Sequence, residues 1–243
     1  MDYTTNTAIN VNVRSIHISS EVVDIKNSDN AIIKGVKINV ESKPVYEFFK
    51  RAFDIVASLL GIIVLSPLLL VIALIIKFSD KGPVFFVQNR TGKDGKVFKM
   101  YKFRSMYVDA EKRRNELLDQ NEADGPLFKI AKDPRVTKIG AFIRKTSIDE
   151  LPQLFNCLIG NMSVVGPRPL VTYEQDQCTE YQAQRLLVKP GITCYWQISG
   201  RSDLNFDDLI ELDLKYIKER SFLTDIKIIF KTFSAVLKSK GAY

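Results

Sequence analysis

Residues 53–78 read FDIVASLLGIIVLSPLLLVIALIIKF, and no side chain between Asp54 and Lys77 is charged. As a straight helix, Ile55 to Ile76 would rise roughly 33 Å, about the thickness of one hydrocarbon core. Core helices of soluble proteins rarely run apolar on every face over such a length, and a secretory signal would be shorter and closer to the N-terminus. The segment is therefore predicted to enter a membrane.

Two features argue that this segment does not simply cross the membrane. Ser66 and Pro67 lie near its centre, where proline removes a backbone donor and clashes with the preceding turn, so a sharp bend is expected. The Ser66 hydroxyl can bond a carbonyl that the break frees. Basic side chains flank both ends of the segment: Lys43, Lys50, Arg51, Lys77 and Lys81. Because cytoplasmic flanks collect Lys and Arg, the pattern favours a re-entrant hairpin with both ends in the cytoplasm, and leaves a kinked spanning helix open.

The composition of the chain limits its chemistry. The 243 residues carry a formal net charge of +7, which suits an anionic membrane surface, phosphate-rich ligands or nucleic acid. The three cysteines lack CxxC spacing and are interpreted as reduced thiols. The one histidine, His17, argues against a His-based zinc site and a Ser-His-Asp triad. Carboxylates must therefore serve as acid, base or nucleophile.

Three parts are predicted along the chain. Residues 1–42 alternate apolar and polar side chains, which indicates short strands or a weakly ordered arm. Residues 43–80 hold the membrane segment, and residues 81–243 form a cytosolic domain. In that domain two strand-like runs flank Asp94-Gly95 and predict a β-hairpin, and residues 107–120 predict a charged amphipathic helix.

The densest group of polar residues is IRKTSIDELPQLFNCLIGNMSVVGPRPL, residues 143–170. A helical repeat of apolar residues that ends at Gly160 predicts a short helix with that face in the core; the repeat is Leu151, Leu154, Phe155 and Leu158. Asp149 and Glu150 then lie at its N-terminus. Their spacing alone favours a capping box, in which Glu150 and Ser147 satisfy each other's backbone groups.

The arginines near the acidic pair suggest a different role for it. Arg144 lies just before the pair, Arg168 lies in the Gly- and Pro-containing turn GPRP, and Arg201 lies in the Gly-containing turn SGRS. Arginine side chains and helix N-terminal amides together make phosphate sites. A phosphate beside two carboxylates usually requires a divalent cation. This arrangement predicts phosphoryl transfer.

From about Lys50 to Tyr243 the chain resembles the bacterial sugar transferases, the monotopic polyprenyl-phosphate phosphoglycosyl transferases. The matching stretches are KRAFDIVASLLGIIVLSPLLL, GPVFFVQNRTGKDGKVFKMYKFRSM, RKTSIDELPQLFNCLIGNMSVVGPRP, KPGITCYWQISGRSD and the terminal GAY. The resemblance implies an α/β mixed, mainly helical catalytic domain carried by a re-entrant helix-break-helix, with amphipathic interfacial helices. It also implies that Ser66-Pro67 is the membrane break and that the domain lies on the cytoplasmic face of a bacterial inner membrane.

The activity implied by the resemblance is the transfer of a sugar 1-phosphate. The donor is a nucleotide diphosphate sugar, expected to be a UDP-hexose; the acceptor is polyprenyl (undecaprenyl) phosphate, and UMP is released. This would be the first membrane step of exopolysaccharide, capsule or glycoconjugate synthesis. Larger members carry spanning helices ahead of this region, so the resemblance implies a minimal catalytic form.

The resemblance also implies residue roles. Asp149 is the nucleophile of a ping-pong reaction through an aspartyl phospho-sugar, and Glu150 is its neighbour at a Mg²⁺ ion that both would bind. Arg144, Arg168 and Arg201 bind or orient phosphate groups. The polar residues at the mouth of the re-entrant helix are Lys50, Arg51 and Asp54, for which a plain interfacial anchor is the alternative. Many relatives have glycine where this chain has Cys194, which makes the ligand contacts of that turn less certain.

Other interpretations stay open. A membrane-tethered binding or scaffold protein would need the acidic pair only as a helix cap. Nucleic acid is not expected as a partner, because no aromatic-basic motif accompanies the positive charge. A homodimer is a candidate assembly, and the sugar cannot be named. Near the C-terminus, an apolar stripe with lysines at its edges fits core packing and an interfacial helix equally; it contains Phe222, Ile226, Ile229, Phe230 and Phe233.

Overall fold

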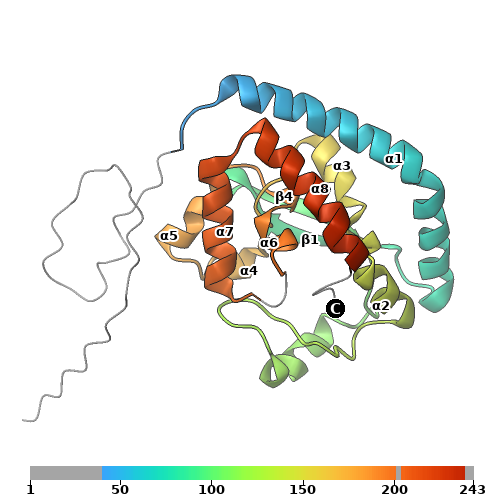
Figure 1. Ribbon diagram of the computed structural model, residues 1–243. Helices are drawn as coiled ribbons and strands as arrows, with labels where there is room; N and C mark the ends of the chain where they lie inside the picture. Colours follow the sequence, from blue (N-terminus) through green and yellow to red (C-terminus); the bar gives the residue numbers. More distant parts are fainter. Residues whose placement is uncertain (1–39, 201–203, 239–243) are drawn as a thin grey trace, which may run out of the picture. The chain divides into compact units, whose positions relative to one another are not determined.

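The computed structural model describes residues 40–200 and 204–238, so the predicted N-terminal strands lie outside the described residues. The expected α/β mixed, mainly helical class is confirmed there (Figure 1). In chain order the elements are α1 (Pro44–Asp80), β1 (Phe85–Thr91), the 3-10 turn η1 (Lys93–Gly95), β2 (Val97–Phe103), the 3-10 helix η2 (Lys112–Gln120), α2 (Lys138–Lys145), the 3-10 turn η3 (Ile148–Glu150), α3 (Gln153–Ile159), β3 (Ser163–Val165), α4 (Thr172–Gln175), α5 (Glu180–Ala183), the 3-10 turn η4 (Gln184–Leu187), β4 (Gly191–Thr193), α6 (Tyr195–Ile198), α7 (Phe206–Glu219) and α8 (Phe222–Lys238).

Two small sheets organise the part of the chain that follows α1, here called the globular domain (residues 83–238). The predicted hairpin is confirmed, since β1 and β2 pair antiparallel with Phe85 opposite Phe103. At its turn Asp94 and Gly95 have φ values of 56° and 75°, a left-handed conformation that these two residue types tolerate well. Strands β3 and β4 form a parallel pair, with Ser163 opposite Gly191.

Helix α7 supplies much of the core. Its apolar side chains lie on one face and are almost fully buried, together with Leu170; they are Phe206, Leu209, Ile210, Leu214 and Ile217. Asn205 begins the helix by accepting a hydrogen bond from the Asp208 backbone N–H at 2.7 Å, and acidic residues fill the first turn. This packing holds α7 firmly against the turn that follows β3.

Helix α1 is continuous over 37 residues and contains one proline, Pro67. Among the described residues, it is the one helix long and apolar enough to cross a membrane. Figure 1 shows that its ribbon bends sharply rather than running straight. Pro67 cannot donate to the carbonyl of Ile63, and Ser66 Oγ donates to that same oxygen at 2.8 Å. The predicted compensation by Ser66 is thus confirmed.

The N-terminal half of α1 is fastened to the globular domain by charged residues. Arg51 donates to the carbonyls of Cys157 and Leu158, at 2.6 and 2.9 Å, at the C-terminal end of α3. Asp54 is 2% exposed, and its carboxylate accepts hydrogen bonds from Ser163 Oγ and from the Val164 backbone N–H, both at 2.9 Å. These bonds satisfy helix-end carbonyls and a buried carboxylate, so they fix this half of α1 in place.

The C-terminal half of α1 also packs on the globular domain. Ile72 and Ile76 are buried in a cluster with Phe103 of β2 and Ile143 of α2. The two halves of α1, on either side of Pro67, therefore contact one and the same domain. A straight helix through Pro67 would carry one half away from these contacts.

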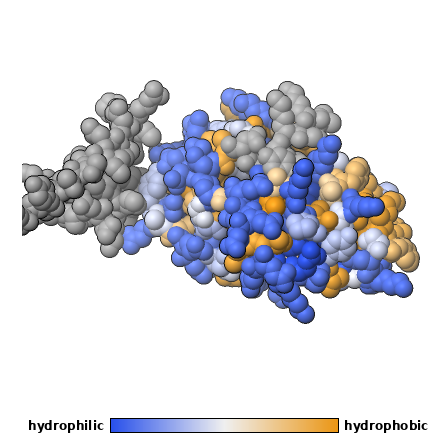
Figure 2. All heavy atoms as spheres, turned by 90° about the horizontal axis from the view of Figure 1, so that it is seen from below, coloured by the Kyte–Doolittle hydropathy of each residue, from blue (hydrophilic) through white to orange (hydrophobic). Residues whose placement is uncertain are grey.

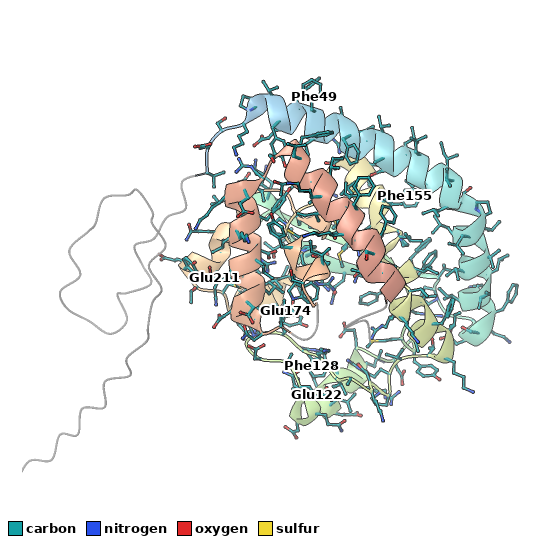
Figure 3. All side chains as sticks on the ribbon, viewed as in Figure 1. Phe49, Glu122, Phe128, Phe155, Glu174 and Glu211 are labelled. Atoms are coloured by element: carbon teal, nitrogen blue, oxygen red, sulfur yellow. The ribbon has the colours of Figure 1, made fainter. Side chains whose placement is uncertain are left out.

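Most of the remaining α1 surface is apolar and exposed. Val64, Leu70 and Phe78 are 71%, 62% and 79% exposed. Phe49 points outward from the helix in Figure 3, and Figure 2 shows apolar side chains gathered at the edge of the molecule where the second half of α1 lies. Exposed apolar surface of this extent marks an interaction with a membrane or another apolar partner.

Two details of the predicted helices were wrong. In α3 the buried side chains are Gln153, Asn156 and Cys157, whereas the predicted apolar face is half-buried or exposed, because α3 packs on the hairpin through its polar side. Asn156 bonds the backbone of β2 there. The predicted amphipathic helix is a 3-10 helix, η2, without a buried residue, since it offers only two leucines among charged residues.

In α8 the residues of the predicted stripe differ in burial. Ile226 and Ile229 are half-buried, whereas Phe222, Phe230 and Phe233 are 47%, 70% and 64% exposed. Core packing is therefore wrong for these three phenylalanines. The interfacial alternative stays a prediction.

Candidate active site

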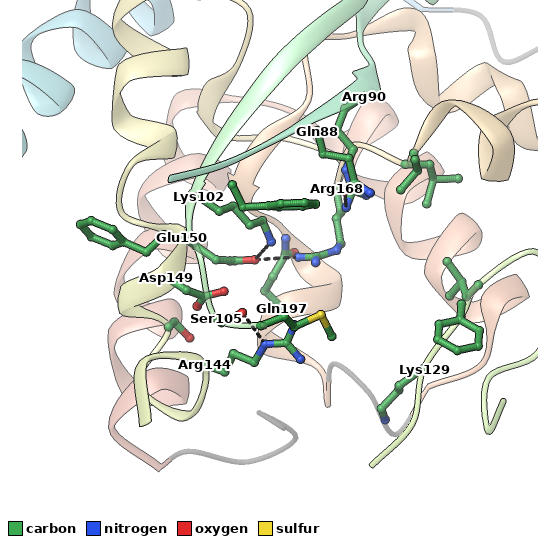
Figure 4. A pocket seen from close by; sticks show the side chains of 18 of the residues that line it. Gln88, Arg90, Lys102, Ser105, Lys129, Arg144, Asp149, Glu150, Arg168 and Gln197 are labelled. Atoms are coloured by element: carbon green, nitrogen blue, oxygen red, sulfur yellow. Dashed lines mark hydrogen bonds and ion pairs between the residues drawn. The ribbon is translucent and has the colours of Figure 1, made fainter. Parts of the chain in front are cut away.

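A cavity of about 1200 Å³ opens between the hairpin, η3, the segment 122–130 and α8. Figure 4 shows charged side chains converging on one part of it. Asp149 and Glu150 line it together with Arg144 and Arg168. One wall includes Leu154, which packs against Gly61 of α1, where an added Cβ would lie 3.1 Å from Leu154 Cδ1. Leu154 therefore lies between the cavity and the apolar helix.

The backbone before α3 directs the acidic pair into this cavity. Ser147 has a φ of 58°, so the chain turns sharply between α2 and η3. The predicted capping box is wrong: the Ser147 backbone N–H donates to Arg144 O at 2.9 Å, and the Glu150 carboxylate bonds cationic side chains instead. Asp149 is 8% exposed. The carboxylates are thus available for chemistry rather than for capping.

Two cations hold Glu150. Lys102 Nζ donates to Glu150 Oε1 at 2.8 Å, and Arg168 Nη1 donates to the same oxygen at 3.2 Å, as Figure 4 shows. Lys102 precedes Phe103 at the end of β2; since side chains alternate along a strand, Phe103 enters the core while Lys102 enters the cavity. The Arg168 guanidinium also lies 5.3 Å from the ring centre of Trp196.

The two carboxyl groups are electrostatically different. Burial raises the pKa of Asp149; Lys102 opposes that rise and the Glu150 carboxylate adds to it. For Glu150, burial alone would raise the pKa, but Lys102 and Arg168 hold it well below its usual range. A buried pair of like charges with separated pKa values is typical of functional sites.

Two further arginines, Arg144 and Arg90, line the cavity with Lys102 and Arg168; these four residues are here called the basic wall. Arg144 donates from Nε to Ser105 Oγ at 2.8 Å, and burial lowers its pKa while Asp149 opposes that shift. Arg90 donates to Gln88 Oε1 and to a backbone carbonyl, and burial lowers its pKa to about 10. Anionic groups of a ligand would be stabilised throughout this region.

The structure brings some predicted residues together and separates others. Arg144, Arg168, Asp149 and Glu150 share the cavity, whereas Lys50, Arg51 and Asp54 do not line it. The latter three fasten α1 to the globular domain; Lys50 does so through an ion pair with Asp225 at 2.7 Å. Arg201 lies outside the described residues, although Gln197 and Leu204 on either side of that segment line the cavity.

Three further residues line the cavity and were not predicted from the sequence: Lys102, Arg90 and Ser105. The one available signal was a lysine between two aromatic residues in the predicted strand containing MYKFRSM. Alternation places such a lysine on the strand face opposite Tyr101 and Phe103, but does not say what it meets there.

Asp149 and Glu150 are the candidate ligands for a divalent cation in the cavity. No group of three or more His, Cys, Asp or Glu side chains suited to a metal occurs within residues 40–200 and 204–238. Asp149 and Glu150 supply hard carboxylate oxygens, and Mg²⁺ is commonly held by one or two carboxylates, waters and substrate phosphates. The two residues fit an ion that arrives with a diphosphate, provided that Glu150 loosens its ion pairs.

Comparison with known proteins identifies the family. The sequence model described as bacterial sugar transferase matches residues 45–239. The chain belongs to the bacterial sugar transferase family. The recognised resemblance is thereby confirmed, and the cavity lies within the matched region.

Curated members of the family are similar to most of this chain. It is 42% identical over 239 residues to the galactosyl transferase CpsE of Streptococcus agalactiae, covering 96% of this chain and 52% of that protein. It is 44% identical over 204 residues to the undecaprenyl-phosphate galactose phosphotransferase of Salmonella typhimurium, covering 81% and 42%. It is 41% identical over 205 residues to the UDP-N-acetylgalactosamine-undecaprenyl-phosphate N-acetylgalactosaminephosphotransferase of Aeromonas hydrophila, covering 82% and 46%. The chain thus spans about half the length of these relatives.

Proposed function

We propose that the protein is a phosphoglycosyl transferase that moves a sugar 1-phosphate from a UDP-hexose to undecaprenyl phosphate and releases UMP. One observation carries the proposal: the buried Asp149 carboxylate lies beside Glu150, which two cations already hold, in a cavity whose lining residue Leu154 packs against the apolar helix α1. The names of the relatives support the lipid acceptor and the UDP donor. The product would enter exopolysaccharide, capsule or glycoconjugate synthesis.

Asp149 is the nucleophile in this proposal. Its carboxylate oxygen attacks the phosphorus that carries the sugar, and the bond from that phosphorus to the bridging oxygen of UMP breaks. UMP leaves with the bridging oxygen, and an aspartyl phospho-sugar remains. A phosphate oxygen of undecaprenyl phosphate then attacks the same phosphorus, which frees the carboxylate. The nucleotide and the lipid need never occupy the site together.

The basic wall stabilises both displacements. Lys102, Arg168 and Arg144 face the region where negative charge is transferred, so they bind phosphate oxygens and orient them for in-line attack. Arg201 joins them on the strength of the resemblance. Asp149 and Glu150 would hold Mg²⁺, and the bound ion would supply positive charge that neutralises the substrate phosphates.

The proposed membrane topology is a re-entrant hairpin at the cytoplasmic face of the inner membrane. Contacts of α1 with the globular domain on both sides of Pro67 support it, because a spanning helix would place its halves at opposite membrane surfaces. Charged Arg51 and Asp54 then stay at the entrance of the hairpin. Its apolar exterior lies in one leaflet.

Cysteine labelling tests this topology. In a variant without native cysteines, Val45→Cys and Ser79→Cys, at exposed positions near the two ends of α1, are each expected to resist an impermeant thiol reagent on intact cells. Both should react after the membrane is permeabilised, which controls for accessibility. Labelling of either cysteine from outside would favour the kinked spanning helix.

A panel of UDP-sugars tests the activity. Purified protein in detergent, with undecaprenyl phosphate, is expected to release UMP from one or more of these donors. A chelator should abolish release and added Mg²⁺ should restore it. A membrane-tethered scaffold would release no UMP from any donor. The donor that supports the highest kcat/KM identifies the sugar, which the relatives, named for galactose and N-acetylgalactosamine, leave undecided.

A further inference from the structure

A buried ion pair outside the cavity holds the main chain of Arg168. The pair joins Arg185 of η4 and Asp213 of α7, whose side chains are 2% and 0% exposed. Arg185 Nη2 donates both to Asp213 Oδ2 and to the backbone carbonyl of Arg168. Three segments far apart in the sequence therefore meet at one guanidinium group.

Asp213 in turn holds Arg185. Burial raises the pKa of Asp213 to about 6, and Arg185 opposes that rise through its charge and its hydrogen bond. Pro167 and Pro169 flank Arg168, have no N–H group of their own and restrict the backbone. The ion pair thus restrains the backbone of Arg168, whose side chain bonds Glu150.

The position of the Arg168 side chain depends on this restraint of its backbone. Its Nη1 lies 3.2 Å from Glu150 Oε1, and its guanidinium lies 5.3 Å from the ring centre of Trp196. A side chain with four rotatable bonds is held in such a geometry only if its backbone is fixed. A shift of about 1 Å in a group that positions a substrate can cost about 10²-fold in rate.

Packing alone does not account for this pair. Removing two charges from water is costly, and replacing a buried ion pair by apolar side chains of similar volume is often neutral or stabilising. Asp213 lies among the buried apolar residues Leu209, Ile210 and Leu214 of α7, where an apolar side chain would pack well. The charges have a clear use: Arg185 bonds the backbone carbonyl of Arg168, and Asp213 neutralises and orients Arg185.

We propose that Arg185 and Asp213 are positioning residues, which act on the reaction by fixing the main chain of Arg168 and so aiming its guanidinium at the phosphate region. The inference rests on the proposed function for the role of Arg168 itself. The restraint on the Arg168 main chain is a separate claim that can be measured without turnover.

The decisive variant is the apolar exchange Arg185→Met with Asp213→Leu. It is expected to fold with a melting temperature close to that of the wild type. Its kcat for UMP release should fall about 10-fold or more, because Arg168 is no longer held in place. If the exchange folds and keeps the wild-type kcat, the pair is only structural. If it does not fold, Arg185→Lys, which keeps the charge on a shorter side chain without the rigid guanidinium plane, should lower kcat by a smaller factor, and an unchanged kcat in that variant would overturn the proposal.

A double-mutant cycle separates positioning from general damage. In an Arg168→Ala background the apolar exchange should cost less than about 3-fold further, since residues that act through one side chain are not additive. A full additional loss would overturn the proposal. Arg220→Met is the matched control: Arg220 is 4% exposed and bonds the carbonyls of Ile217 and Glu41, but does not contact Arg168. Its effect on kcat should be small and additive with Arg168→Ala.

A spectroscopic readout requires no activity. Trp196 is the single tryptophan of the chain, so its fluorescence reports on the guanidinium beside its ring. The emission of the apolar exchange is expected to match that of Arg168→Ala rather than that of the wild type. Wild-type emission in the exchange variant would refute the positioning role. If no UDP-sugar were turned over, the proposed function would fail while this measurement would still decide the positioning role.

Discussion

Asp149→Asn is expected to fold normally and to lose transferase activity by about 10³-fold or more, because the amide cannot replace the carboxylate as nucleophile. With a UDP-sugar but no lipid acceptor, the wild type should release about one UMP per active site and gain the mass of a hexose phosphate, the stoichiometric burst of a ping-pong enzyme. The variant should show neither. Mass spectrometry of the intact protein and a UMP assay measure both outcomes.

The matched control is Asp94→Asn in the hairpin turn. Asp94 is exposed, does not line the cavity and has a φ of 56°, which asparagine tolerates, so its burst and its turnover should equal those of the wild type. Two results would contradict the aspartyl intermediate. One is near wild-type turnover by Asp149→Asn; the other is UMP that appears only when undecaprenyl phosphate is present, with no trapped adduct. Direct transfer would then replace the two-step mechanism.

Lys102→Met is expected to lower kcat/KM by about 10²-fold, comparable to the loss of one preorganised donor in other enzymes. Lys102 makes the shorter of the two bonds to Glu150, at 2.8 Å. Methionine is unbranched and of similar length, but it carries no charge. Without the lysine, Glu150 loses its strongest cationic neighbour, so the variant should also require a different Mg²⁺ concentration for half-maximal rate. Steady-state UMP release over a magnesium series measures both effects.

Lys99→Met serves as the control on the same strand. The Lys99 side chain is exposed and does not line the cavity, so the variant loses the same charge from β2 without touching Glu150. Its kcat/KM should stay within about 2-fold of the wild type, as for a solvated surface charge. Equal losses in the two variants would mean that the net charge of the domain matters and that the bond to Glu150 does not.

Local signals predicted several features of this chain correctly. The bend of α1 follows from Pro67, and the Ser66 bond to Ile63 closes within one helical turn. The hairpin follows from Asp94-Gly95 between two strand-like runs. Asp149 and Glu150 were predicted as site residues because they are adjacent and arginines lie near them in the sequence. The structure places them with Arg144 and Arg168 in one cavity. Each of these inferences needed only the sequence of a short segment and its known chemistry.

The failed predictions concern which face of a helix meets which neighbour. The apolar repeat of α3 was expected in the core, yet the polar Asn156 is fully buried, because it bonds the backbone of β2 at Lys99 and Tyr101. In α8 the sequence left core packing and an interfacial position equally open for the apolar stripe, and Phe230 and Phe233 are exposed. An apolar stripe specifies that a face avoids water. It does not distinguish a protein core from a lipid surface.

By itself, the sequence determined the apolar helix, its central bend, the hairpin turn and the adjacent acidic pair, because each depends on backbone and side-chain preferences within a few residues. Only the tertiary structure brought Lys102 to Glu150, across 48 positions, and Arg185 to Asp213, across 28. Such pairs form when strands and helices that are distant in the chain pack together, and a buried charge then requires the partner that the packing supplies. No pattern within one segment contains that information, so the contact of Lys102 with Glu150 and that of Arg185 with Arg168 could be found only in the folded chain.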